Sequence, residues 1–293
     1  MKKTGRELNK LNYIDYIIMI VLGIWALVIF YPFYNTILVS LVTQRTYVRT
    51  PFLIIPNNIT FDSYLTLLSY KPMINGFKVS SIVVILGVIY TLLMTVSMAF
   101  AMTKKFPGQK LIMTTILIPM YFGGGLIPTY VIMTRLGLID NIAALILPVG
   151  LNFYYMFLIR NYFQSLPPSL EESAKIDGAN DIVILFRIIL PLALPVIATI
   201  VLFCSVDLWN SWFGGLIYIK TAEKRPLQLV MRSLIIESSA ISRKMASSGQ
   251  KREYFTDGLK MGAVVVTMLP VMIIYPFLQK YFMKGIMIGA VKS

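Results

Sequence analysis

The sequence predicts an all-α membrane protein with six transmembrane helices and both termini in the cytoplasm. Hydrophobic residues make up 57% of the 293 residues and charged residues 14%, whereas soluble domains have about 45–50% and about 25%. Six stretches free of Asp, Glu, Lys and Arg approach the length of about 20 residues that a spanning helix needs. Basic residues lie between these stretches, and their distribution predicts the orientation.

The composition excludes several kinds of site. The chain has one cysteine, Cys204, and no histidine, so it has no intrachain disulfide, no zinc site of the usual Cys/His type and no histidine-dependent triad. A net charge of +14 would suggest nucleic acid in a soluble protein. Here the basic residues flank apolar stretches, so we expect a lipid bilayer and no nucleic acid as partner. We predict no enzyme activity, catalytic residue, metal or cofactor.

In chain order, the predicted spans are Tyr16–Gln44, Val79–Thr103, Leu111–Thr134, Asn141–Ile159, Ile188–Val206 and Met261–Gln279. The first has too long an apolar run for a removable signal and no small-residue cleavage site after it, so we expect an anchor. After it, Pro51, Pro56 and the pair Asn57-Asn58 predict an external loop.

Short basic loops predict that both termini are inside. The N-terminal tail, the loop TKKFPGQK at 103–110 and the C-terminal end are rich in lysine and arginine, and six spans place all three on one side. The segment 214–260 carries nine basic residues yet falls outside, but long loops count little toward orientation. We therefore expect one transmembrane domain, 1–293, with an extracellular loop at 214–260.

The third span contains helix breakers. Its sequence PMYFGGGLIPTY includes Gly124 between two further glycines, followed by Pro128. One interpretation is a bend that lines a pathway. The other is close helix packing through small residues.

An acidic segment separates the fourth and fifth spans. Of the thirteen acidic residues, four lie within eleven positions, and they are Glu171, Glu172, Asp177 and Asp181. Pro167-Pro168 should end the fourth helix, and Ser169 with Glu172 matches a capping box for a short helix to about Ile176.

Gly178 is suited to a sharp turn at positive φ. After it, Asn180 or Asp181 can cap a second helix, IVILFRIIL, and Pro191 marks the entry to the fifth span. Residues 164–190 thus form an elbow of two short helices, which is larger than a simple connection requires and suggests a docking element.

The elbow resembles the cytoplasmic loop motif of type I ABC importer permeases. The motif is E-A-A, three residues, G, nine residues, I, any residue, L-P, and the matching positions are Glu172, Ser173, Ala174, Gly178, Ile188, Leu190 and Pro191. Only Ser173 departs from it. GGGLIPTY, WNSWF at 209–213, PLQL at 226–229 and the final QKYFMKGIMIGAVKS are similar to maltose-type carbohydrate permeases, in the branch for complex and acidic oligosaccharides (aldouronate or lipoprotein-type).

The resemblance implies a binding-protein-dependent ABC importer in the bacterial cytoplasmic (inner) membrane. The chain would be one multi-pass half of a permease heterodimer, with an ATPase dimer on its elbow and a solute-binding protein outside. The ATPase-coupling positions would be Glu171, Glu172, Ser173, Ala174, Asp177, Gly178, Ile188, Leu190 and Pro191. The loop before the last span would contact the binding protein through Ser248, Gly249 and Gln250. The sequence has no G-x-x-x-x-G-K-[ST] motif, so ATP must be hydrolysed by a partner.

Aromatic and polar residues near the outer end of the fifth span are candidates for the substrate pathway. The fifth predicted span continues past one acid, Asp207, to Ile219, and intramembrane acids are often functional. The candidate set is Asp207, Trp209, Asn210, Trp212, Tyr154, Tyr155 and Gly124. The alternative is an interfacial aromatic belt. The outer segments also carry more basic than acidic residues, which would attract an anionic sugar or an acidic binding protein.

Two other functions compete with an oligosaccharide importer. A carrier driven by protons or sodium usually needs acids or histidines at the bilayer midplane, and this chain has no histidine and one peripheral acid. An ABC permease for a non-sugar solute would share the elbow. The resemblance of WNSWF and of the C-terminal sequence to carbohydrate permeases favours a sugar.

Overall fold

The structure is a computed structural model and describes residues 13–50, 54–56, 58–236 and 255–290. The regular elements in these ranges are all helices, as the sequence predicts. The chain divides into two compact units, residues 1–67 with 239–265 and residues 68–238 with 266–293.

The first unit is built from α1 (Tyr13–Ser40), α2 (Gln44–Arg49), most of α3 (Asp62–Ser69) and the start of α16 (Thr256–Ala290). Leu38 and Val42 form its buried centre, and the hydroxyl groups of Ser40 and Tyr64 lie 2.6 Å apart. The side chains of α1 from Tyr13 to Tyr31 are exposed and mostly apolar, as expected for a helix solvated by lipid.

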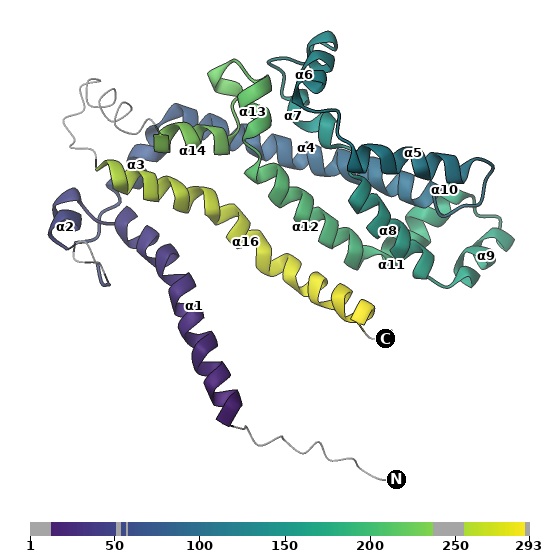
Figure 1. Cartoon of the computed structure of the whole chain (residues 1–293), viewed down its shortest axis with the longest axis horizontal. Helices are drawn as coiled ribbons and strands as arrows, with labels where there is room; N and C mark the ends of the chain where they lie inside the picture. The colour runs from purple at the N-terminus through teal and green to yellow at the C-terminus, as the bar shows by residue number, and fades with distance from the viewer. Residues whose placement is uncertain (1–12, 51–53, 57, 237–254, 291–293) are drawn as a thin grey trace. The chain divides into compact units, whose positions relative to one another are not determined.

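The second unit follows a longer order of elements (Figure 1). It contains α4 (Lys71–Ala101), α5 (Gln109–Tyr121), α6 (Leu126–Arg135), α7 (Ala143–Ile146), η1 (Leu147–Val149), α8 (Phe153–Ser165), α9 (Pro168–Ile176), α10 (Asp181–Ile184), η2 (Leu185–Ile189), α11 (Leu190–Leu192), α12 (Leu194–Asn210), α13 (Phe213–Tyr218), η3 (Ala222–Lys224), α14 (Leu227–Ile236) and the rest of α16.

The second unit packs around α4, which α8, α12 and α14 all contact. Glycines allow the close approach: a Cβ atom on Gly87 would lie 2.6 Å from Leu208 Cδ1, and one on Gly76 would lie 3.1 Å from Leu227 Cα. The Leu227 N–H donates to the buried Ser80 hydroxyl at 2.9 Å. Small residues let membrane helices approach closely, because in lipid the helices associate through van der Waals contacts and not through the hydrophobic effect.

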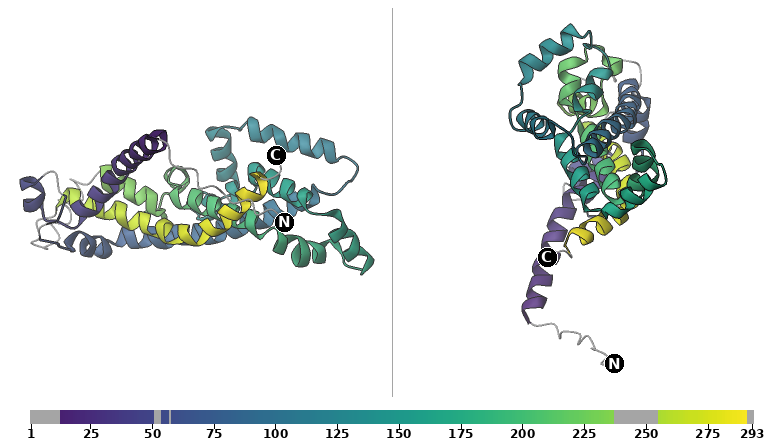
Figure 2. Two further views of the ribbon diagram at one scale, coloured as in Figure 1. Left: turned by 90° about the horizontal axis from the view of Figure 1, so that it is seen from below. Right: turned by 90° about the vertical axis from the view of Figure 1, so that its right-hand side faces the viewer.

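Within the described residues, three helices are long and apolar enough to cross a membrane unbroken: α1, α4 and the Thr256–Pro276 part of α16. The described residues reach six spans if each of three bent helix pairs counts as one. The pair α5–α6 bends by 111°, the pair formed by residues 143–149 and α8 by 48°, and the pair formed by residues 181–192 and α12 by 82°. The predicted third span is therefore a broken one. Figure 2 shows α5 and α6 diverging at residues 122–125.

Part of the segment 214–260 is folded. The helix α14 buries Leu227, Leu229 and Val230 and packs on α4, so residues 227–236 do not behave as a free loop. In LQLVMRSLII the apolar residues recur at helical spacing, and this pattern could have predicted the amphipathic helix from the sequence.

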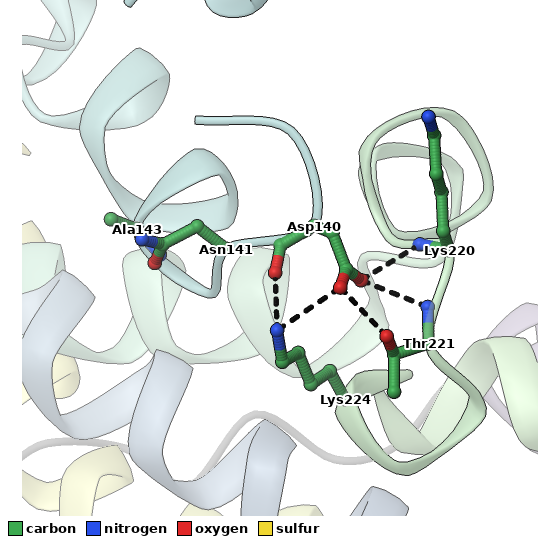
Figure 3. Close-up of polar contacts among 6 residues, drawn as sticks. All are labelled: Asp140, Asn141, Ala143, Lys220, Thr221 and Lys224. Carbon is green, nitrogen blue, oxygen red and sulfur yellow. Dashed lines mark hydrogen bonds and ion pairs between the residues drawn. The ribbon is translucent and has the colours of Figure 1, made fainter. Parts of the chain in front are cut away.

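Asp140 joins two turns of the second unit (Figure 3). It lies between α6 and α7 at φ 62°, a left-handed conformation that Asp tolerates better than most residues. Its carboxylate accepts hydrogen bonds from the backbone N–H groups of Lys220 (3.0 Å) and Thr221 (2.8 Å) and from the Thr221 hydroxyl (2.6 Å). Lys224 Nζ lies 3.1 Å from Oδ2. These bonds, those of Thr221 first, hold the pKa of Asp140 well below its usual range.

Asp140→Asn should lower the melting temperature of the detergent-solubilised chain at pH 7, because an amide presents a donor where the carboxylate accepts. Glu223→Gln removes a charge from the same turn and is the matched control, with no expected change. Because the pKa of Asp140 is lower in the folded state, Asp140 contributes to the free energy of unfolding at pH values above its unfolded pKa of about 3.9. This contribution is lost as the pH falls from there through the folded-state pKa. Equal melting temperatures of wild type and Asp140→Asn at pH 7 would contradict this role.

Candidate functional site

The first elbow helix, α9, begins two residues earlier than the predicted N-cap at Ser169 implies. Pro167 is its N-cap and Pro168 its first helical residue, without a side-chain cap bond. The predicted capping box of Ser169 with Glu172 is therefore wrong. Proline is favoured at the first helical position because its missing N–H would have no partner there and its φ is already helical.

The turn after α9 depends on Gly178, as predicted. Its φ is +80°. The Gly178 N–H donates to Lys175 O at 3.1 Å, and the Ala179 N–H donates to Ala174 O at 2.9 Å. This pair of bonds is a Schellman motif, which closes a helix when the residue after the C-cap is left-handed.

Asn180 caps the second elbow helix. Its Oδ1 accepts from the Val183 N–H at 2.9 Å, which confirms one of the two predicted caps. The helix runs through α10, the π-helix η2 and α11. Pro191 has no N–H to donate to the carbonyl of residue 187, and the Leu190 N–H instead reaches back to Leu185 O.

The helix α12 starts after Ile188, the residue at which the sequence predicts the fifth span to begin. Ile188, Leu190 and Pro191 belong to the second elbow helix, and the chain turns by 82° before α12 begins at Leu194. Ala193 is fully buried at this bend. Composition could not locate the boundary, because the end of the elbow and the start of the span are equally apolar.

Lys104, in the loop between α4 and α5, links the two elbow helices. Its ammonium group pairs with Glu171 of α9 and lies 3.3 Å from Oδ1 of Asp181 in α10. It also lies 4.4 Å from the ring centre of Phe100. Lys175 adds a second pair to Glu171 at 2.8 Å. Sequence reasoning placed this loop and the elbow on the same side but missed the pairing.

The network changes the ionisation of Glu171. Partial burial acts to raise its pKa, but hydrogen bonds and charges from Lys104 and Lys175 outweigh burial, and the pKa is lowered. Two of the four elbow acids, Glu171 and Asp181, thus form ion pairs within the chain.

The side of the elbow that faces away from the core of the second unit is exposed. Glu172, Ser173 and Asp177 are exposed, whereas Ala174 is buried in the core of the second unit. Among the described residues, neither Glu172 nor Asp177 has an ion-pair partner. Ile176 is 86% exposed beside these charges. In Figures 1 and 2, α9 projects at one end of the helices around α4.

The pathway candidates near the end of α12 differ in exposure. Trp209 is 6% exposed; its indole N–H donates to Thr267 O at 3.0 Å, and the edge of Phe77 packs on it. Asp207 is exposed and accepts a 2.8 Å hydrogen bond from the hydroxyl of buried Tyr155. The structure thus brings Asp207 and Tyr155 together, while Trp209 is a packed residue.

The remaining candidates are accessible. Asn210 Oδ1 lies 3.3 Å from Gln228 Nε2, and the half-buried Trp212 lies under the guanidinium of Arg232. Tyr154 is exposed. Gly124 is exposed, and a Cβ atom on it would meet nothing within 4 Å in the described part of the chain, so packing within this chain does not explain the glycines. Ser248, Gly249 and Gln250 lie outside the described residues.

Comparison with known proteins extends the match beyond the elbow. The family model for the binding-protein-dependent transport system inner membrane component matches residues 83–288. The polygalacturonan/rhamnogalacturonan transport system permease protein YtcP of Bacillus subtilis (strain 168) is 36% identical, covering 95% of this chain and 98% of its own. Protein LplC of the same strain is 38% identical, with coverage of 99% and 97%.

A solved structure shares the fold. A chain of a bacterial ABC transporter involved in the import of the acidic polysaccharide alginate is 31% identical, with a TM-score of 0.86 and coverage of 92% of this chain and 98% of that one. The family model matches more than half of this chain, and the relatives are more than 30% identical over nearly all of it. The chain therefore belongs to the inner membrane components of binding-protein-dependent transport systems, as an ABC transporter permease with the type I importer fold.

Proposed function

We propose that this chain is the permease subunit of an importer that carries acidic oligosaccharides into a bacterial cell. It works as a heterodimer with a second permease in the cytoplasmic membrane, with both termini and the elbow in the cytoplasm. A solute-binding protein delivers the sugar from outside. Two relatives support the acidic class, one named for polygalacturonan and rhamnogalacturonan and the other for alginate.

The observation that carries the proposal is the elbow. Its Schellman turn at Gly178 holds two helices at a fixed angle, and Lys104 ties both of them to the end of α4. The exposed face combines Glu172 and Asp177 with Ile176. An exposed isoleucine with two carboxylates nearby suits a partner surface that has an apolar centre and a basic rim, and we assign this surface to the ATPase subunit.

The pathway is proposed to pass the outer end of α12. Asp207, hydrogen-bonded to Tyr155, and the accessible Asn210 and Trp212 offer the polar and aromatic groups that sugars need.

The test is reconstitution. The chain alone should show neither uptake nor ATP hydrolysis. With a second permease, an ATPase pair and a purified binding protein, ATP hydrolysis should rise when the binding protein is loaded with trigalacturonate. Uptake by the single purified chain driven by a proton or sodium gradient would overturn the proposal, and stimulation only by a non-sugar solute would overturn the substrate class.

A further inference from the structure

Arg232 of α14 is held against an aromatic ring at the outer end of α12. The centre of its guanidinium lies 3.9 Å from the ring centroid of Trp212. The ring of Phe213 packs against the same indole in a T-shaped arrangement, with 5.6 Å between the ring centroids. A guanidinium placed over an indole is favourable, and its N–H donors remain in its own plane. The contact therefore fixes the group without using its hydrogen-bonding capacity.

The charge of Arg232 has no counter-charge among the residues that the structure describes. The side chain is exposed, and the ion pairs in the described ranges involve other residues. A planar, fixed guanidinium matches a carboxylate through two parallel hydrogen bonds, a geometry that lysine cannot provide.

Two amides lie beside this arginine. Gln228 is one helical turn before Arg232 on α14, so the two share a face. Its Nε2 donates to Oδ1 of Asn210 at 3.3 Å, which leaves the Asn210 amide nitrogen and the Gln228 carbonyl oxygen for other partners. The cluster thus offers a cation, an amide donor, an amide acceptor and an aromatic ring.

The cluster and the elbow lie at opposite ends of α12. The helix leaves the elbow at Leu194 and ends at Asn210, and at a rise of 1.5 Å per residue its ends are about 24 Å apart. With the elbow in the cytoplasm, the cluster lies toward the outer face, where a delivered sugar enters the permease.

We propose that Arg232, Gln228 and Asn210, with Trp212 as the support of Arg232, form a subsite for a uronate residue of the transported oligosaccharide. Arg232 binds the sugar carboxylate, and the two amides hydrogen-bond its hydroxyl groups. This inference rests on the proposed function and deepens it, because it names the residue that distinguishes acidic from neutral sugars.

The experiment compares trigalacturonate with its fully methyl-esterified form, which has the same ring and linkage but no charge. Binding of each is measured by calorimetry on the purified complex of both permeases and the ATPase, without binding protein. Arg232→Gln should weaken binding of trigalacturonate by roughly tenfold or more, the usual size of a charge-assisted contact, and leave binding of the ester unchanged. Arg232→Lys should fall between wild type and Arg232→Gln.

Lys220→Gln is the matched control, since it removes an exposed positive charge from a neighbouring turn and should change neither affinity. An Arg232→Gln complex that binds trigalacturonate as wild type does, or that loses acid and ester equally, overturns the subsite. If that happens while wild type still couples sugar to ATP hydrolysis, the proposed function stands. A wild-type complex that neither binds a saccharide nor hydrolyses ATP in response to loaded binding protein overturns both.

Discussion

Gly178→Val should leave the chain inserted and abundant in the membrane but uncouple sugar uptake from ATP hydrolysis. Gly178 sits at φ +80°, and a Cβ atom there would meet nothing within 4 Å. The penalty is therefore conformational, about 1–2 kcal/mol for a side chain forced into the left-handed region. That is too little to unfold a membrane domain, but the turn can escape it by giving up the Schellman bonds to Lys175 and Ala174, which reorients the two elbow helices.

Gly137→Val is the matched control. Gly137 is also left-handed, at φ +67°, with nothing within 4 Å of an added Cβ atom, but it lies in the turn after α6, away from the elbow. The measurements are membrane abundance, co-purification of the ATPase and the ratio of sugar taken up to ATP hydrolysed. Uptake with a normal ratio in Gly178→Val would mean that the elbow is not a docking element.

The structure also changes what is expected of Glu172. The sequence suggested that it caps its own helix, but α9 starts at Pro168 without a side-chain cap. Glu172 is exposed, so replacing it with alanine removes only the proposed contact to the ATPase and should have a milder effect than the valine at Gly178.

The sequence predicted features that arise from local chemistry. The positive φ of Gly178 and the cap by Asn180 both follow from residue types that favour these positions. The end of α9 at Ile176 agrees as well. Hydropathy located the apolar segments, because burial in lipid depends on composition.

Features that depend on tertiary packing were not predicted. The 82° bend before Leu194 separates two apolar helices with similar composition, so hydropathy has no boundary to detect. The packing of α14 on α4 needs Gly76 opposite Leu227, which are 151 positions apart by their numbers. Lys104 looked like an ordinary membrane-flanking lysine, and only the fold brings it to Glu171 and Asp181.

Lys104→Met should reduce coupled transport while leaving the chain folded. Methionine has a similar length and packs well against an aromatic ring such as Phe100, so little packing is lost. The two pairs to Glu171 and Asp181 are partly exposed, and each such pair is worth about 0.2–1 kcal/mol, which the whole chain can lose without unfolding. The elbow cannot lose them without effect, because they are the charge contacts that join α9 and α10 to the end of α4.

Without the ammonium group, Lys175 still pairs with Glu171, but the link between Glu171 and Asp181 is lost and the two carboxylates are no longer drawn together across the turn at Gly178. The elbow then presents its exposed face at a variable angle, and we expect a lower ratio of uptake to ATP hydrolysis and weaker co-purification of the ATPase. Lys104→Arg keeps the charge and should restore both. Lys105→Met removes a neighbouring exposed lysine and should behave as wild type.

Salt distinguishes this mechanism from a general loss of packing. Raising the ionic strength screens the attraction of Lys104 for the two carboxylates in wild type, so the difference in coupling between wild type and Lys104→Met should shrink as salt increases. A difference that persists unchanged at high salt, or a loss in Lys105→Met as large as that in Lys104→Met, would show that Lys104 does not act by holding the elbow acids together.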